Sequence, residues 1–238
     1  MLSEILKKSL PVYEVKFPSS NKTHRFRPMT VKEEKTLLLA QNEGKPNGMA
    51  YAIKNIIESC FEGIKNAGDL DLIDSQVAFL HLRSKSIGEV FSFQIKCPET
   101  GQDLTLSCQL SDFKQKIEKD KLNKIKLKDD IILILKSPTL RYFIEKEGES
   151  NDPVKDLFVN CFSEVHTTDS VISKSEISKE EIQEFFDTFT IEQYSNVMKF
   201  FENIPKMELE INYTTKDEVQ RKVRFDGLES FFELASVI

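Results

Sequence analysis

The sequence predicts an α+β fold in which helical bundle segments are combined with three antiparallel β-hairpins. Three segments, at residues 12–27, 90–110 and 206–225, alternate apolar with polar residues on either side of a turn, which is typical of half-buried strands. Between the first two, apolar residues recur at spacings of three and four, which is the period of an α-helix. A chain of 238 residues with 39% hydrophobic content can bury a core, as one large domain or two small ones.

The first hairpin leads directly into a capped helix. Its strands flank a turn at residues 18–21. Thr30 followed by Glu33 forms a capping box, because the Thr hydroxyl can accept the backbone N–H three residues on while the Glu side chain reaches back to the N–H of Thr30. The helix is expected to run to about Gln41, since Gly44 is a common exit signal.

Two more helices precede the second hairpin. Residues 48–65 carry isoleucines at helical spacing, and a third helix is expected from an Asp74 cap to about Lys85. The second hairpin should turn at residues 98–101.

The four cysteines are expected to be free thiols. They stand at positions 60, 97, 108 and 161 and form no C-x-x-C pair. If residue 97 faces residue 102, Cys108 lies near residue 91, roughly 20 Å along the strand at about 3.3 Å per residue. This register fits neither a disulfide nor a shared metal ion, so no metal site is predicted. A small zinc-stabilised module stays open as an alternative if the register is wrong or a second chain supplies ligands.

The second half of the chain opens with a basic segment. Residues 114–128 are rich in lysine, and we interpret them as a solvated amphipathic helix or loop and as a candidate docking surface for an acidic protein. Residues 148–153 form the clearest linker. It divides the chain into an N-terminal α+β region, 1–147, and a C-terminal helical region with a terminal hairpin and helix, 153–238, unless the two form one compact unit.

The remaining elements are expected in the following order: a strand at 130–136, a short helix at 139–145, a helix at 153–161 with Pro153 in its first turn, a loop or irregular covering strand at 163–178, a helix opened by the capping box of Ser178 and Glu181, a helix at 190–203, the third hairpin, and a closing helix from Gly227 through Leu234.

Composition and motifs argue against several function classes. A formal net charge of −6 argues against a nucleic-acid partner. No apolar run reaches membrane-spanning length, and the N-terminus lacks a signal-peptide pattern, so we expect a cytoplasmic protein. The histidines at 24, 81 and 166 have no catalytic or metal-binding spacing, and no glycine-rich phosphate loop is present. We therefore predict no catalytic residues, no cofactor and no enzymatic activity.

Three stretches carry a family resemblance. They read MTVKEEK at residues 29–35, LRSKSIGE at 82–89 and FDGLESFF at 225–232. This pattern resembles the baseplate hub proteins of T-even-type contractile-tailed bacteriophages, a family of hub subunits and hub assembly factors. The resemblance implies a non-enzymatic tail protein that forms or helps assemble the central hub through contacts with other hub or tail proteins.

The implied location is the host cytoplasm during assembly and the baseplate of the virion. The sequence leaves open whether the chain stays as a subunit or leaves as an assembly chaperone, and which oligomeric state it has. A cytoplasmic protein-binding adaptor unrelated to phage is the competing interpretation.

Arg83 is a candidate for an ion pair. Basic residues in the last turn of a helix interact favourably with its negative end. An Arg fork can also hold a carboxylate in two hydrogen bonds, either within the fold, with Glu33 or Glu34, or on a partner protein. We favour the internal pairing.

The aromatic residues supply candidate partner contacts. The chain has 18 phenylalanines and no tryptophan. Consecutive residues of a helix point about 100° apart, so adjacent phenylalanines cannot both face the core of a thin bundle. The predicted partner-binding residues are the three adjacent pairs of the last third, Phe185, Phe186, Phe200, Phe201, Phe231 and Phe232.

Overall fold

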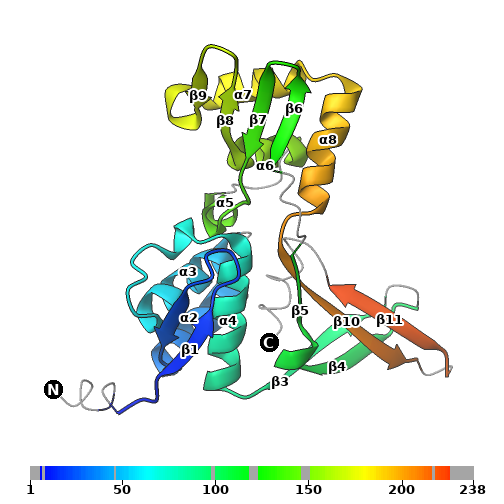
Figure 1. The fold of residues 1–238 in the computed structure, drawn as a ribbon. Helices are drawn as coiled ribbons and strands as arrows, with labels where there is room; N and C mark the ends of the chain where they lie inside the picture. Colours follow the sequence, from blue (N-terminus) through cyan, green and yellow to red (C-terminus); the bar gives the residue numbers. More distant parts are fainter. Residues whose placement is uncertain are drawn as a thin grey trace.

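The first part of the chain packs three helices beside a β-hairpin. The structure is a computed structural model that describes residues 6, 9–45, 47–97, 100–117, 123–145, 151–215 and 218–225, without the side chain of Phe93. The elements in chain order are the antiparallel strands β1 (Tyr13–Lys16) and β2 (Thr23–Phe26), the helices α2 (Val31–Glu43) and α3 (Gly48–Cys60), the 3-10 turn η1 (Ala67–Asp69) and the helix α4 (Leu72–Ser86). Figure 1 shows the hairpin lying across these helices.

Helix α3 was expected to run to Lys65, and this end was wrong. The helix ends at Cys60 because Phe61 takes an extended conformation and forms a bridge with Phe26 of β2. The two rings stack with centroids 5.0 Å apart. A tertiary aromatic contact therefore ends the helix before its apolar period does.

The Asp74 cap was also wrong, since Asp71 precedes α4 and Asp74 lies inside it. The buried carboxylate of Asp74 accepts the backbone N–H of Ser19 at 2.9 Å and the Ser19 hydroxyl. Asp74 thus fastens the turn of the β1–β2 hairpin to α4.

Two long hairpins extend away from the helices towards the lower right of Figure 1. One is β3 (Val90–Lys96) with β4 (Asp103–Gln109); the other is β10 (Lys206–Thr214) with β11 (Gln220–Phe225). The turn η2 (Leu110–Asp112) follows β4, and β5 (Lys114–Lys116) pairs with β10 on the side opposite β11. The predicted register is confirmed, because Phe91 lies opposite Cys108.

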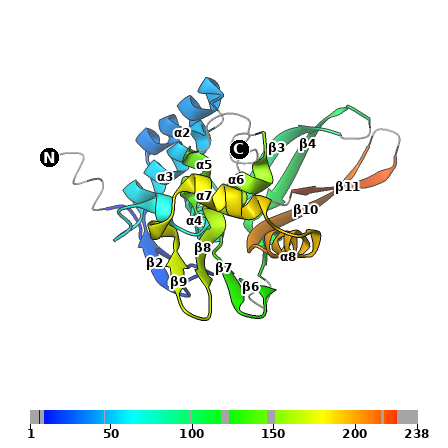
Figure 2. The ribbon, with the colours of Figure 1, turned by 90° about the horizontal axis from the view of Figure 1, so that it is seen from above.

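A four-stranded antiparallel sheet with helices on one face forms the other end of the molecule (Figures 1 and 2). Its strands are β6 (Lys124–Lys128), β7 (Ile131–Leu135), β8 (Phe162–His166) and β9 (Val171–Ser173), and its helices are α6 (Pro153–Cys161), α7 (Lys179–Asp187) and α8 (Ile191–Glu202). The short helix α5 (Leu140–Glu145) contacts α3 and η1 instead. The expected start of α6 at Pro153 and the Ser178–Glu181 capping box of α7 are confirmed.

The segment 114–128, predicted as a helix or loop, contains two strands, and the segment 163–178, left open between a loop and an irregular covering strand, contains strands. Residues 114–116 and 124–128 form β5 and β6 in place of a helix or loop, and residues 162–166 and 171–173 form β8 and β9. The period-two alternation of lysine with apolar residues from Lys124 to Lys128 buries Ile125 under α8 and leaves the lysines outside. The closing helix expected after Gly227 lies outside the described residues.

The buried side chains form two hydrophobic clusters. The first core joins the β1–β2 hairpin, α3, α4 and α5 with β4 and β10. The second core fills the space between the β6–β9 sheet and α6, α7 and α8. The predicted α+β class is confirmed. The division of the chain at residues 147–153 stays a prediction. Each hydrophobic cluster combines residues from both sides of that linker, since Met207 and Leu209 belong to the first core and Ile125 and Leu133 to the second.

Candidate protein-binding surfaces

The phenylalanines of α7 and α8 lie mainly in the second core. Phe186 and Phe200 are buried, while Phe185 and Phe201 are half-buried and pack against the same cluster. The rings of Phe158 and Phe186 lie 4.8 Å apart, so the aromatic excess of this region largely fills one core. The predicted contacts Phe231 and Phe232 lie outside the described residues.

The corner between α7 and α8 nevertheless exposes apolar surface. Ile191, the first residue of α8, is 90% exposed, and Tyr194 one turn later is 39% exposed. The Tyr194 ring contacts Phe186 with centroids 5.8 Å apart, and half-buried Phe189 lies beside Phe186 and Phe158. An exposed aliphatic side chain next to packed aromatic rings is typical of a protein-binding contact. We call Ile191, Tyr194 and the half-buried Phe185 and Phe189 the α7–α8 corner.

Glu33 forms an ion pair with Arg27, a residue that sequence reasoning missed. The Arg27 guanidinium donates to the Glu33 carboxylate at 2.8 Å, and the side chains are only 16% and 8% exposed. The second carboxylate oxygen accepts the Thr30 N–H at 2.8 Å, so the predicted capping box is confirmed. Burial acts to raise the pKa of Glu33, but the hydrogen bonds from Arg27 and Thr30 and the positive charge of Arg27 outweigh it and lower this pKa to about 2.

The internal pairing of Arg83 with Glu33 or Glu34 stays a prediction. Burial lowers the pKa of Arg83, and the negative charge of nearby Glu34 acts in the opposite direction. The guanidinium carbon also lies 6.0 Å from the centre of the Phe91 ring, within the range of a cation–π contact. These contacts link the end of α4 to α2 and to β3, and a role in holding the fold together accounts for them.

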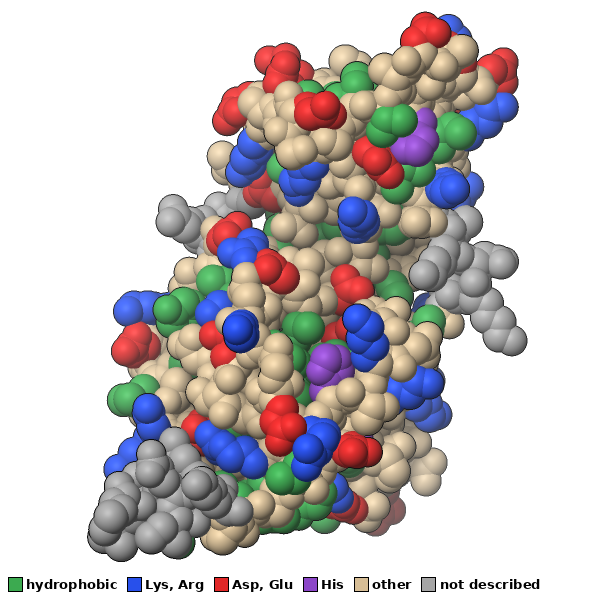
Figure 3. Space-filling model, turned by 60° about the vertical axis from the view of Figure 1, so that its left-hand side comes forward, with side chains coloured by type: hydrophobic (Ala, Val, Ile, Leu, Met, Phe, Trp, Pro, Cys, Tyr) green, Lys and Arg blue, Asp and Glu red, His purple; other side chains and the backbone are tan. Residues whose placement is uncertain are grey.

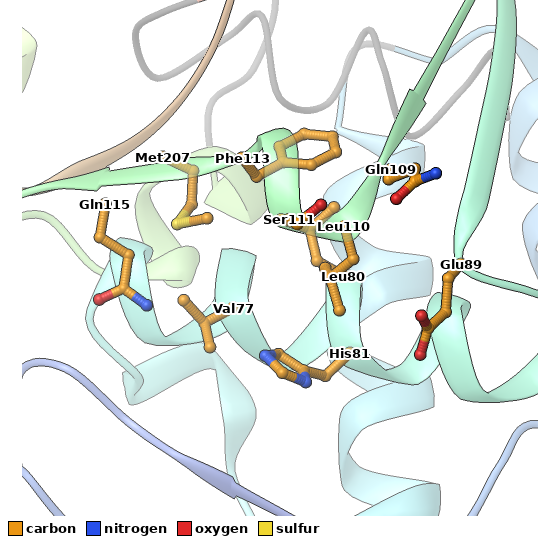
Figure 4. Close-up of a pocket in the computed structure, with 10 residues that line it drawn as sticks. All are labelled: Val77, Leu80, His81, Glu89, Gln109, Leu110, Ser111, Phe113, Gln115 and Met207. Carbon is orange, nitrogen blue, oxygen red and sulfur yellow. The ribbon is translucent and has the colours of Figure 1, made fainter.

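A groove opens between α4, η2 and the β5–β10 pair (Figure 4). Val77, Leu80 and His81 line it from α4, and Leu110 and Phe113 line it from the opposite side. Its volume of about 280 Å³ is at the lower end of the sizes of small-molecule sites. Burial, and then the charge of Lys85, lowers the pKa of His81, which favours the neutral imidazole. We call this cavity the α4 groove.

Two buried polar side chains of α4 carry a hydrogen-bonding atom without a partner among the described residues. Gln76 is fully buried; its Oε1 accepts the backbone N–H of Met207 at 3.1 Å, and its Nε2 has no hydrogen-bond partner in the described part of the chain. The buried hydroxyl of Ser84, two turns further on, also has none there. A glutamine within the apolar face between Ile73 and Leu80 was the sequence signal for this feature.

Basic side chains line the exposed edge of the β6–β9 sheet. Lys124, Lys126 and Lys128 are exposed on β6, whose outer edge pairs with no described strand. Lysines on an edge strand oppose its pairing with strands of other proteins. Docking of an acidic protein on this segment stays a prediction.

Helix α2 also exposes apolar side chains, among them Val31, Leu38 and Leu39. Figure 3 looks onto this side of the molecule and shows hydrophobic side chains as separate patches among interspersed acidic and basic ones. Scattered exposed apolar residues are ordinary on protein surfaces. The α2 surface therefore supplies a useful control rather than a site.

The described residues contain no group of three or more His, Cys, Asp or Glu side chains that could hold a metal ion. All four cysteines are free and buried, and burial raises the pKa of Cys60 and of Cys108 to about 12. In the described part of the chain, no helix is both long and apolar enough to cross a membrane.

Comparison with known proteins gives the family. The chain matches the family model described as T4 bacteriophage base plate protein over residues 10–233. It belongs to this family. No match was found among curated proteins or among solved structures. The matched range of this baseplate protein includes both hydrophobic cores, the α7–α8 corner and the α4 groove.

Proposed function

We propose that this baseplate protein forms or helps assemble the central hub of the baseplate, without enzymatic activity, by binding other hub or tail proteins. The family match over residues 10–233 carries the proposal. The resemblance of residues 29–35 and 82–89 to hub proteins directs it to the hub. The protein would act in the host cytoplasm during assembly and either remain in the virion baseplate or leave as a chaperone.

The α7–α8 corner is the surface that we propose for partner binding. Ile191 and Tyr194 are exposed while the rings beneath them are fixed by the second core, so a partner can bury apolar surface without reordering this region. The half-buried Phe189 contacts Phe185 and Phe186, and Phe186 in turn contacts Tyr194, so these rings form one aromatic cluster. Aromatic and aliphatic anchors of this kind commonly carry much of the binding energy of an interface.

The test is capture of the other tail proteins encoded by the same phage, using the full chain as bait. We expect Ile191→Asp to reduce capture at least tenfold while the circular dichroism spectrum and the melting temperature stay unchanged. An aspartate in the first turn of α8 is compatible with the helix dipole, so folding should be preserved. The matched control is Val31→Asp, which places the same charge at the first position of α2, where the apolar side chain is also exposed.

If the Ile191→Asp variant captures tail proteins as well as the unaltered chain does, the binding surface is not the α7–α8 corner. Capture of no tail protein by the unaltered chain would contradict the hub assignment and favour the adaptor interpretation. Mass spectrometry of purified particles separates a subunit, present in fixed ratio to other baseplate proteins, from a chaperone, which is absent. One equivalent of zinc that is lost in Cys97→Ser would instead support the zinc-stabilised module.

A further inference from the structure

The strand β3 pairs with β4 on one side only. The other side of β3, which we call the β3 edge, pairs with no strand in the described part of the chain. The Glu89 carbonyl accepts the N–H of Leu110, and the Cys97 N–H donates to the Gln102 carbonyl, so the backbone groups of these odd-numbered residues point towards β4. Backbone groups alternate between the two sides of a strand. The residues whose N–H and C=O groups point to the β3 edge are therefore Val90, Ser92, Gln94 and Lys96.

The β3 edge lacks the protection that the other edge strands of the described chain have. Edge strands are commonly short or charged, because their free backbone groups would otherwise pair with another chain. β6 has lysine at three of its five positions, and β11 contains Arg221, Lys222 and Arg224. β1, β2, β5 and β9 have only three or four residues each, and β4 contacts β10. β3 has seven residues, VFSFQIK, with no proline and no charge before Lys96.

The two faces of β3 limit how another strand can pair with it. Val90 and its alternate neighbours Ser92 and Gln94 are exposed on the outer face, with Val90 59% exposed. On the inner face Phe91 is buried and Ile95 is half-buried against the first core. An antiparallel partner must place its own outward-bonding residues opposite those of β3, and opposed residues of two strands lie on the same face.

A second copy of β3 meets both conditions. If a two-fold axis passes through the backbone of Phe93, all seven positions of the two strands are paired. Ser92 then lies opposite Gln94 of the second copy on the outer face, and these positions have their backbone groups directed at each other. Phe91 lies opposite Ile95 of the second copy on the inner face, so apolar side chains meet apolar ones.

The charges at the two ends of β3 also favour an antiparallel second copy. The strand is preceded by Glu89, whose side chain is exposed, and it ends at the exposed Lys96. The two-fold arrangement opposes Lys96 to the uncharged Val90 of the second copy and brings Glu89 near Lys96 at both ends. A parallel second copy would instead bring each charge close to its own equivalent, which is unfavourable.

We propose that two copies of this protein pair through the β3 edge as a two-fold dimer, in which the two β3–β4 hairpins form one four-stranded antiparallel sheet. Figure 1 shows this hairpin extending away from the helices, at the opposite end of the molecule from α7 and α8. Dimer formation is therefore independent of the hub assignment and of binding at the α7–α8 corner. One strand edge is a small interface, so the dimer should dissociate on dilution.

The first test is sedimentation velocity of the full-length chain over a range of concentrations, which should show a monomer–dimer equilibrium. The double variant Ser92→Lys, Gln94→Lys places like charges opposite each other at two points of the interface and should weaken dimerisation about tenfold. The matched control is Thr105→Lys, Ser107→Lys. These two exposed residues are the direct neighbours of Gln94 and Ser92 on β4, so the control adds the same charge to the same face one strand further from the second copy.

The control variant should dimerise as the unaltered chain does, and both variants should keep its circular dichroism spectrum. An unaltered chain that stays monomeric at every concentration would overturn the proposal. Equal weakening of the dimer in the two double variants would also overturn it, because a general effect of added charge would then explain the result.

A second test locates the interface. Chains that carry the photoreactive residue benzoyl-phenylalanine at position 94 are mixed with isotope-labelled unaltered chains and irradiated. We expect position 94 to be joined to the labelled peptide of residues 86–96. Joining to another labelled peptide would mean that two copies meet at a different surface, and joining only within one chain would mean that the chain covers its own β3 edge; either result refutes the proposal.

Discussion

Replacing Glu33 with glutamine removes the charge from the best-supported buried ion pair of the described structure. The folded carboxylate has a pKa of about 2 against an ordinary 4.5, because the hydrogen bonds from Arg27 and Thr30 outweigh the effect of burial. At about 1.4 kcal/mol per pKa unit this difference corresponds to about 3 kcal/mol. The amide oxygen of the Glu33→Gln variant can still accept from Thr30, so we expect the free energy of unfolding to fall by about 2 kcal/mol at pH 7.

The pH dependence gives the sharper result. A carboxylate with a lowered pKa in the folded state stabilises the fold above its unfolded pKa, and this stabilisation is lost as the pH falls from 4.5 towards 2. Urea unfolding between pH 7 and pH 3 should therefore show the gap between the parent chain and Glu33→Gln closing on acidification. Glu43→Gln is the control, since Glu43 lies on the same helix in an exposed pair with Lys45. A gap that is absent at pH 7, or that persists unchanged at pH 3, would refute the assignment of the lowered pKa to Glu33.

Two further predictions concern α4. Arg83→Ala should lower the melting temperature more than Lys85→Ala does. Arg83 is half-buried beside Phe91, whereas Lys85 pairs with exposed Glu89 at the surface. Equal shifts of the melting temperature in the two variants would contradict this. Asp74→Ala should destabilise the fold by about 1–3 kcal/mol and speed hydrogen exchange at residues 18–21, since it leaves the Ser19 N–H without its acceptor. Unaltered exchange in that turn would show that other contacts hold it.

The features that were predictable from sequence are those specified within a few neighbouring residues. The Thr30–Glu33 and Ser178–Glu181 capping boxes and the start of α6 at Pro153 each depend on residues within one helical turn, and the structure confirms them. The register of the second hairpin follows from its short turn for the same reason.

The features that were missed depend on partners distant in sequence. β8 pairs with β7 across the whole of α5 and α6, so nothing within residues 163–178 alone distinguished a strand from a loop. Asp74 was predicted as a helix cap because its actual partner, Ser19 in the turn of the first hairpin, is distant in sequence. Arg27 carried a usable signal, because a basic side chain directly before a capping box can reach the acidic residue of that box.

The two candidate binding regions are joined by a short and stiff segment. Ile204, just after α8, belongs to the second core, and Met207, near the start of β10, belongs to the first. Between them Pro205 restricts the backbone to φ near −65°, which removes much of the freedom of a short linker. A partner that displaces α8 would disturb the second core, to which Val197 and Phe200 of α8 belong. The short segment from Ile204 to Met207 connects this core to the hydrogen bond that the Met207 N–H donates to Gln76 of α4. Exchange at α4 in the partner-bound protein therefore reports whether the α7–α8 corner and the groove act together.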